Sequence, residues 1–120
     1  MMNIARLEQA GVNYHKGVNR FLGDAELYEL VLMSFLDSDI LARSEDAYNS
    51  RDYKKLFECV HEMKGASGNA DMEALYRISC TLTETLRNGN PDAAQTDVQF
   101  SQFRDTYKAT MQAIREACDK

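Results

Sequence analysis

Apolar residues recur at steps of three and four along the C-terminal part of the chain, and this spacing is the strongest constraint on the fold. The stripe consists of Phe100, Phe103, Tyr107, Met111, Ile114 and Cys118. Side chains at this spacing lie on one face of an α-helix. The pattern therefore predicts a long amphipathic helix that begins around residues 92–94 and packs through this face.

A second long helix is predicted nearer the N-terminus. Asp24 is a good N-cap, and we expect the helix to run from there to about Tyr48. Its first half, residues 27–36, is apolar on nearly all sides. A helix of this kind is normally covered by more than one neighbour, so we expect this half to be buried.

Two more long helices are predicted in the middle of the chain. Ser50 or Asp52 caps the first of them, which extends to about Asn69. Asp71 can cap the next, in which leucine and isoleucine recur at helical spacing. That helix ends at residues 88–91, where a glycine and then a proline stop it.

The first 23 residues are predicted to form two short helical pieces. Asn3 can cap the first piece, which Gly11 closes, and the second ends near Gly23. We expect the second piece to lay three apolar side chains across one end of the molecule. They are Val18, Phe21 and Leu22.

Four amphipathic helices with short connections predict an all-α fold, an antiparallel up-down-up-down four-helix bundle with short extra N-terminal helical segments. No linker or composition change divides the chain. We therefore expect a single domain over residues 1–120, with a helical cap at 1–23 and the bundle at 24–119.

Composition excludes several classes of function. The net charge of −5 argues against nucleic acid as a partner, because proteins that bind the phosphate backbone usually carry a basic surface. The three cysteines fit neither a disulfide framework nor a zinc site, and no apolar run is long enough to cross a membrane. We expect a cytoplasmic monomer without a membrane segment.

Residues 50–75 contain the most informative cluster, built around His61. On a helix, Lys64 lies about 60° from His61, Gly65 about 40° and Gly68 about 20°. One face therefore combines an imidazole, an ammonium group and two positions without side chains. A cation next to a histidine can stabilise a transferring phosphoryl group, and the bare strip can admit the protein that delivers it.

Each of these residues also has an ordinary interpretation. A lone histidine in a helical protein is usually a plain surface or core residue, and an exposed lysine is common. The glycines at 65 and 68 can mark fraying towards the helix end, although glycine inside a helix often permits close approach by a partner. The combination is more informative than any single residue.

The segment from His61 to Met72 resembles the signature of histidine-containing phosphotransfer (HPt) domains of two-component phosphorelays. Their pattern is His-x-x-Lys-Gly, then a stretch of small residues, then a helix with regularly placed leucines. Residues 17–28 and 75–84 also resemble the family, so the likeness covers roughly residues 11–90. Met63 and Asp71 stand where the family often has leucine and glycine.

The resemblance implies a role for each residue of the cluster. His61 is the phosphorylated residue, with a neutral imidazole as nucleophile, and Lys64 steadies the phosphoryl oxygens. Gly65 and Gly68 leave room for the partner. That partner is a receiver domain, of a response regulator or a hybrid histidine kinase, which supplies the aspartyl phosphate and the Mg²⁺. We expect this chain to need no cofactor or metal site of its own.

A docking face is also predicted around His61. Phe57 lies one turn earlier and is either an exposed anchor or a residue at the edge of the bundle core. This face is locally basic on an acidic protein, because it carries Arg51, Lys54, Lys55 and Lys64, and Ser67 completes it. Receiver active sites are acidic, so charge complementarity can steer docking; a solvated run of charges is the alternative.

Three functions are compatible with the sequence. The first is a phosphocarrier without kinase activity, since the chain has no glycine-rich nucleotide loop. The second is a helical adaptor that binds a partner through the same face without phosphorylation. The third, a hydrolase with His61 as base, is weak because Ser67 lies about 120° away and roughly 9 Å along the helix.

Overall fold

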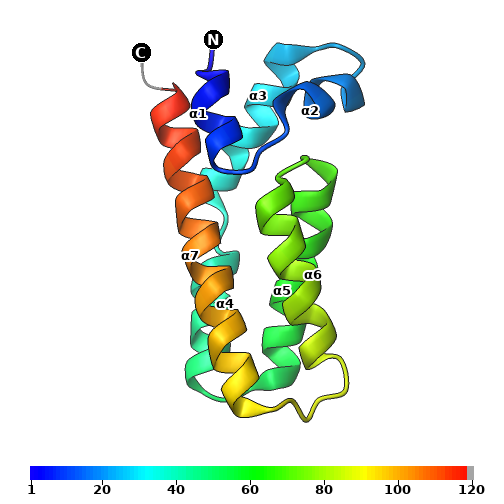
Figure 1. Ribbon diagram of the computed structural model, residues 1–120, viewed down its shortest axis with the longest axis vertical. Coiled ribbons are helices and arrows are strands. Elements are labelled where there is room, and N and C mark those ends of the chain that lie inside the picture. The colour runs from blue at the N-terminus through cyan, green and yellow to red at the C-terminus, as the bar shows by residue number, and fades with distance from the viewer. Residues whose placement is uncertain (119–120) are drawn as a thin grey trace.

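The computed structural model describes residues 1–118 and is built from helices (Figure 1). In order they are α1 (Ile4–Gln9), α2 (Tyr14–Arg20), α3 (Ala25–Ser34), a 3₁₀ turn η1 (Phe35–Asp37), α4 (Ile40–Asn49), α5 (Tyr53–Asn69), α6 (Glu73–Leu86) and α7 (Ala93–Cys118). The described residues contain no β-strand, only one isolated bridge between Val12 and Met72.

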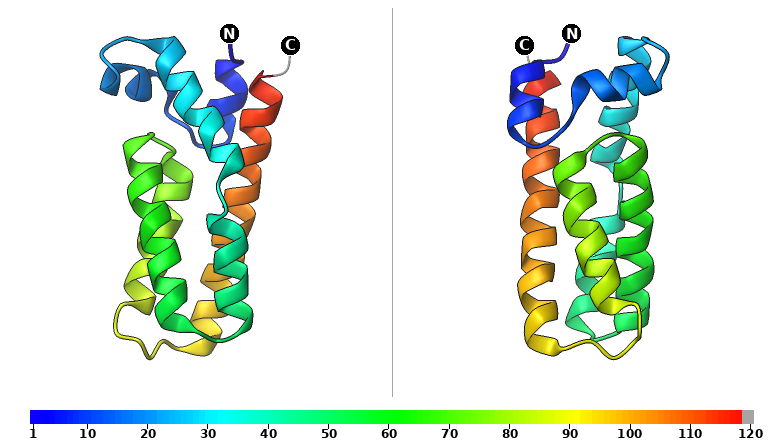
Figure 2. Two further views of the ribbon diagram at one scale, coloured as in Figure 1. Left: turned by 180° about the vertical axis from the view of Figure 1, so that it is seen from behind. Right: turned by 45° about the vertical axis from the view of Figure 1, so that its right-hand side comes forward.

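The helices α4, α5, α6 and α7 form an antiparallel bundle, as predicted. Successive helices run in opposite directions and are joined by short loops, and α5 lies beside both α4 and α6 (Figures 1 and 2). α7 runs the full length of the molecule and pairs with α1 at the end where both termini lie. The all-α bundle is confirmed, and the predicted end of the bundle at residue 119 lies outside the described residues.

Side-chain caps explain where several helices begin. The side chains of Asn3, Asn13, Asp24 and Asp52 each accept a hydrogen bond from the backbone N–H three residues later. Each cap satisfies one of the amide groups that the first turn of a helix leaves without a partner. Asp52, rather than Ser50, is therefore the N-cap residue of α5.

The core lies along the predicted stripe of α7. All of these α7 side chains are buried: Phe100, Phe103, Tyr107, Met111 and Ile114. The facing side of α5 is buried as well, through Leu56, Val60 and Met63. Only Cys118, at the end of the stripe, is partly exposed. The spacing of apolar residues thus identified the buried face of both helices.

The prediction of one continuous helix from Asp24 to Tyr48 is wrong, because the chain breaks between α3 and α4. Ser38 is extended (ψ 138°), and its hydroxyl accepts hydrogen bonds from the Ile40 amide (3.2 Å) and from the Tyr107 hydroxyl of α7 (3.2 Å). Short polar side chains such as serine compete with helical backbone bonds. Here the buried tyrosine of α7 holds the break in place.

The predicted burial of the first half of this segment is also wrong in part. Tyr28 and Leu32 are fully buried, but Leu27, Leu30 and Met33 are 45%, 58% and 42% exposed. Because of the break, α3 leans over the end of the bundle and contacts α2 and α7, so one side of α3 stays open (Figure 2).

The short N-terminal helices cover the end of the bundle, but not with all the residues that were predicted. Val18 and Phe21 pack against the core, whereas Leu22 is 97% exposed. Leu22 has a positive φ of 59° in the turn that leads to α3. Its side chain therefore points away from the bundle, contrary to expectation.

Asp71 does not cap α6 as predicted; Met72 occupies the N-cap position without a side-chain bond. Asp71 has a positive φ of 55°, a backbone conformation that glycine adopts easily. This explains the glycine that the family often has at this position. Its carboxylate is buried and accepts hydrogen bonds from Arg20 Nε (2.9 Å) and Nη2 (3.0 Å). The pair ties α2 to the turn between α5 and α6.

Candidate functional site

His61 lies on the outer side of α5, in the middle of the helix. Leu56, Val60 and Met63 turn inwards and are completely buried, and this fixes the opposite side of the helix towards solvent. His61 is exposed on that side. The regular helix therefore presents an imidazole on a rigid backbone, accessible to another protein.

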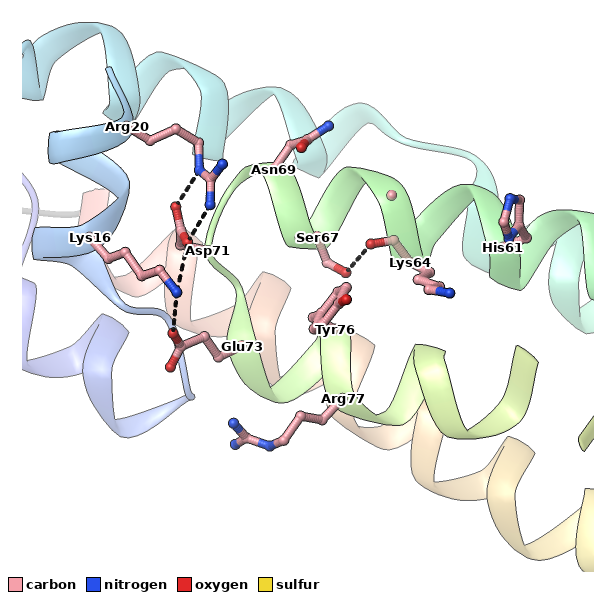
Figure 3. A pocket seen from close by; sticks show the side chains of 12 residues that line it. Lys16, Arg20, His61, Lys64, Ser67, Asn69, Asp71, Glu73, Tyr76 and Arg77 are labelled. Atoms are coloured by element: carbon pink, nitrogen blue, oxygen red, sulfur yellow. Dashed lines mark hydrogen bonds and ion pairs between the residues drawn. The ribbon is translucent and has the colours of Figure 1, made fainter. Parts of the chain in front are cut away.

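Lys64 and Gly65 lie one turn further along the same side. The Lys64 side chain lies on the side of α5 that faces α6 (Figure 3) and makes no ion pair with the described residues. A Cβ atom added to Gly65 would have no neighbour within 4 Å. An unpaired cation and an open strip of backbone thus flank the histidine.

Gly68 differs from Gly65, because a neighbouring side chain already covers it. A Cβ added there would lie 3.0 Å from the Tyr76 ring of α6. The glycine thus lets Tyr76, which is 39% exposed, rest against α5. The room predicted at this position is taken up partly by the protein itself.

The placement of Ser67 on the docking face is wrong. Ser67 is fully buried, and its hydroxyl donates to the Met63 carbonyl oxygen at 2.6 Å. It lies four residues after Met63 and so belongs to the buried side of α5. This placement also removes the weak hydrolase hypothesis, since the hydroxyl cannot serve as a nucleophile beside His61.

Phe57 and Lys54 lie on the N-terminal half of the same helix. Phe57 is half-buried and packs against the core, as the edge-of-bundle interpretation holds, and its ring is stacked on His61. Lys54 is exposed, so its role in docking stays a prediction. Arg51, at the start of the helix, points towards Asp97 and Tyr48 instead.

An open groove of about 640 Å³ runs along α5 from His61 to the turn before α6 (Figure 3). The residues that line it are Lys16, Arg20, His61, Lys64, Gly65, Ser67, Gly68, Asn69, Asp71, Glu73, Tyr76 and Arg77. We name it the His61 groove. Four cationic side chains and two carboxylates surround it.

The cations of α2 and α6 were missed at the sequence level. Arg20 pairs with Asp71, and Lys16 Nζ lies 3.7 Å from Glu73 Oε2. Arg77 is exposed and makes no ion pair with the described residues. The short helix α2 thus adds two cationic side chains to the His61 groove, whereas the sequence had predicted a site formed by α5 alone.

A second group of charges lies at the end of α6. Arg87 donates two hydrogen bonds to Glu84 Oε2, from Nε (3.0 Å) and Nη2 (2.6 Å). These bonds and the charge of Arg87 lower the pKa of Glu84, and Lys64 contributes in the same direction. The negative charge of Glu84 therefore interacts with Lys64, the lysine beside His61.

Neither a metal-ligand cluster nor a membrane-spanning helix occurs in the described part of the chain. The described residues contain no group of three or more histidine, cysteine, aspartate or glutamate side chains able to hold a metal ion. Within residues 1–118, no helix has the length and apolar character needed to span a membrane.

Comparison with known proteins gives one finding. Neither the curated proteins nor the solved structures include a significant match to the chain. The profile of the Hpt domain family, however, matches residues 31–117, which is most of the chain and includes α4 to α7 with His61. Together with the helical bundle and the exposed histidine, this match shows that the chain belongs to the Hpt domain family.

Proposed function

We propose that this protein is a phosphorelay intermediate: His61 accepts a phosphoryl group from the aspartate of one receiver domain and passes it to another receiver domain. Membership of the Hpt family places the chain in two-component phosphotransfer signalling. What we propose beyond this family role is that His61 is the residue that carries the phosphoryl group, with the neighbouring residues assisting it.

The surroundings of His61 are the observation that supports this proposal most strongly. His61 is exposed at mid-helix, and the next turn of the same side offers a glycine with open space above it and a lysine that forms no ion pair within residues 1–118. A reacting histidine must be reached by a second protein, and the transferred group carries negative charge on three oxygens. The exposed imidazole and the neighbouring cation support the proposal on both counts.

The transfer itself is a displacement at phosphorus. A lone pair on one ring nitrogen of neutral His61 attacks the phosphorus of the aspartyl phosphate, and an N–P bond forms. The P–O bond to the aspartate breaks, and the carboxylate leaves with the electron pair. The ring then returns to neutrality by releasing the proton of its other nitrogen to water.

Lys64 supports this step by stabilising charge on the phosphoryl oxygens as they move between the two proteins. The receiver supplies the aspartyl phosphate together with its Mg²⁺, so this chain contributes the nucleophile and a cation. In this scheme the protein is a phosphocarrier and not an enzyme. We further propose that it acts as a cytoplasmic monomer, which agrees with its three free cysteines.

The docking surface of the proposal comprises the side of α5 around His61. Gly65 gives the receiver loops access to the backbone, and the cations along the His61 groove attract the acidic receiver site. Lys54 extends this basic surface towards the start of the helix.

The test is phosphoryl transfer from a panel of phosphorylated receiver domains to the wild-type protein and to His61→Gln. We expect acid-labile, alkali-stable label on the wild type and none on the variant. His61→Gln should fold normally, with a free energy of unfolding within about 0.5 kcal/mol of wild type, because the imidazole is exposed.

The helical adaptor is the competing function, and the same experiment separates it. An adaptor would bind receivers or other partners equally well with glutamine at position 61. Absence of label on the wild type from every receiver of the same cell, with binding retained in both proteins, would replace the relay by the adaptor.

A further inference from the structure

The imidazole of His61 is stacked on the ring of Phe57, one helical turn earlier. The ring centroids are 5.7 Å apart and the planes differ by only 9°. This is the offset parallel arrangement that aromatic rings prefer. His61 is exposed and Phe57 is half-buried, so the phenyl ring forms a fixed wall beside a side chain that otherwise faces solvent.

The phenyl ring is itself held from two directions. It packs against the bundle core, and the Cζ atom of Arg87 lies 5.8 Å from its centroid. Arg87 in turn is fixed by its two hydrogen bonds to Glu84. The contacts form a continuous chain from α6, through Phe57, to the reacting imidazole.

We infer that Phe57 is a positioning residue, which holds the plane of the His61 imidazole for attack on phosphorus. This inference rests on the proposed function and deepens it. An exposed histidine rotates freely about two side-chain bonds, whereas displacement at phosphorus needs the nitrogen lone pair aligned with the bond that breaks. The stack restricts that rotation and leaves the ring edge open to the partner.

A small phosphoryl donor separates positioning from docking. Potassium phosphoramidate transfers its phosphoryl group to imidazole: the N–P bond to His61 forms, the donor P–N bond breaks, and ammonia leaves. This donor needs no protein surface. The rate of labelling by phosphoramidate therefore reports on the imidazole, and labelling by a phosphorylated receiver reports on both the imidazole and the docking face.

Two substitutions provide the comparison. Phe57→Leu keeps an apolar side chain but removes the flat ring, and Phe57→Tyr keeps the ring. We expect Phe57→Leu to lower the rate from both donors by about fivefold or more, and Phe57→Tyr to stay within about twofold of wild type. The matched control is Tyr53→Leu, a half-buried aromatic residue one turn further from His61.

A spectroscopic readout tests the stack directly. In NMR spectra of the wild type, the Cδ2 and Cε1 protons of His61 should show an upfield ring-current shift and nuclear Overhauser contacts to Phe57. Both should persist in Phe57→Tyr, and the shift should disappear in Phe57→Leu. If Phe57→Leu fails to fold, Phe57→Met replaces it.

The outcomes are distinct. Slowing from the receiver alone would make Phe57 a docking anchor and overturn the inference, as would equal rates for all variants or the absence of the ring-current shift in the wild type. A wild-type protein that no receiver labels would instead overturn the proposed function, which is a separate result from the phosphoramidate rates.

Discussion

Arg20 and Asp71 form a two-bonded ion pair between segments that are 51 residues apart in the sequence. The carboxylate is 3% exposed while the guanidinium is 45% exposed. The pair joins the short helix α2 to the turn that follows the His61 helix. It therefore links the N-terminal cap to the wall of the His61 groove.

Removal of this pair should destabilise the protein. Arg20→Ala leaves a buried carboxylate without its main partner, so we expect the free energy of unfolding to fall by about 1–3 kcal/mol. Urea denaturation of the variant and the wild type measures the change. Arg77→Ala removes an exposed arginine that has no ion-pair partner in the described part of the chain, and its free energy of unfolding should stay within about 0.5 kcal/mol of wild type. Equal losses in both variants would contradict the prediction.

Gly65→Ala should raise stability and lower transfer. The new methyl group meets no neighbour within 4 Å, and alanine is favoured over glycine in a helix by about 0.5–1 kcal/mol. In the proposed complex the methyl group narrows the strip that a receiver approaches, so labelling by receivers should slow while labelling by phosphoramidate stays unchanged. Thermal unfolding and the two labelling rates check this. An unaltered rate from receivers would show that the open strip is not used.

Gly17→Ala should have the opposite effect on stability. Its Cβ would lie 2.1 Å from Cζ of Tyr28, a buried ring whose hydroxyl donates to the Ala70 carbonyl at 2.6 Å. The ring cannot move away without loss of that hydrogen bond, so we expect a cost of about 1–3 kcal/mol. Urea denaturation measures it, and a stability equal to wild type would mean that α2 shifts freely.

Lys64→Ala should slow phosphoryl transfer without abolishing it. In the proposed reaction its ammonium group stabilises charge but forms no bond, and removal of one hydrogen-bond donor that stabilises transition-state charge in an enzyme costs roughly 100- to 1,000-fold in rate. Single-turnover transfer from a receiver gives the rate. Lys108→Ala, on an exposed position of α7 away from the His61 groove, is the control and should match wild type. No labelling at all would assign Lys64 a larger role.

Stability should fall in strong alkali. Burial, together with the hydrogen bond to Glu29 and the charge of that residue, raises the pKa of Tyr14 to about 12. The unfolded chain releases this proton near pH 10. The contribution to stability is therefore complete below pH 10 and is lost as the pH rises towards 12.

Tyr14→Phe tests this pH dependence. Urea denaturation between pH 8 and pH 12 should show a shallower decline for the variant, because it has no phenol to ionise. Burial raises the pKa of Tyr28 as well, so some decline should remain. If the free energy of unfolding fell equally steeply with pH in both proteins, ionisation of Tyr14 would not be the cause of the alkaline loss of stability.

Local patterns predicted the His61 helix well. Asp52 caps α5, and the apolar positions Leu56, Val60 and Met63 give its buried side, so the exposure of His61 followed from residues within one helix. Ser67 was misplaced although the signal was present. It stands four residues after Met63, on the buried side, where its hydroxyl is satisfied by the Met63 carbonyl.

Other features depend on contacts between distant residues and carry no local signal. The break at Ser38 is held by Tyr107, 69 residues away. Arg20 enters the groove only because α2 folds over the end of the bundle, and Arg87 reaches Phe57 only through the alignment of α6 with α5. Helical spacing gives the faces of each helix, but not which side chains of two helices meet.

The position of His61 on one open side of a rigid helix has a kinetic consequence. In the proposed function, donor and acceptor receivers use the same surface, so they cannot be bound together and the proposed carrier alternates between them. Such a protein follows ping-pong kinetics, in which an excess of unphosphorylated receiver occupies the surface and inhibits loading. Under the proposed function, the ratio of the two receivers would then set the flux of phosphoryl groups.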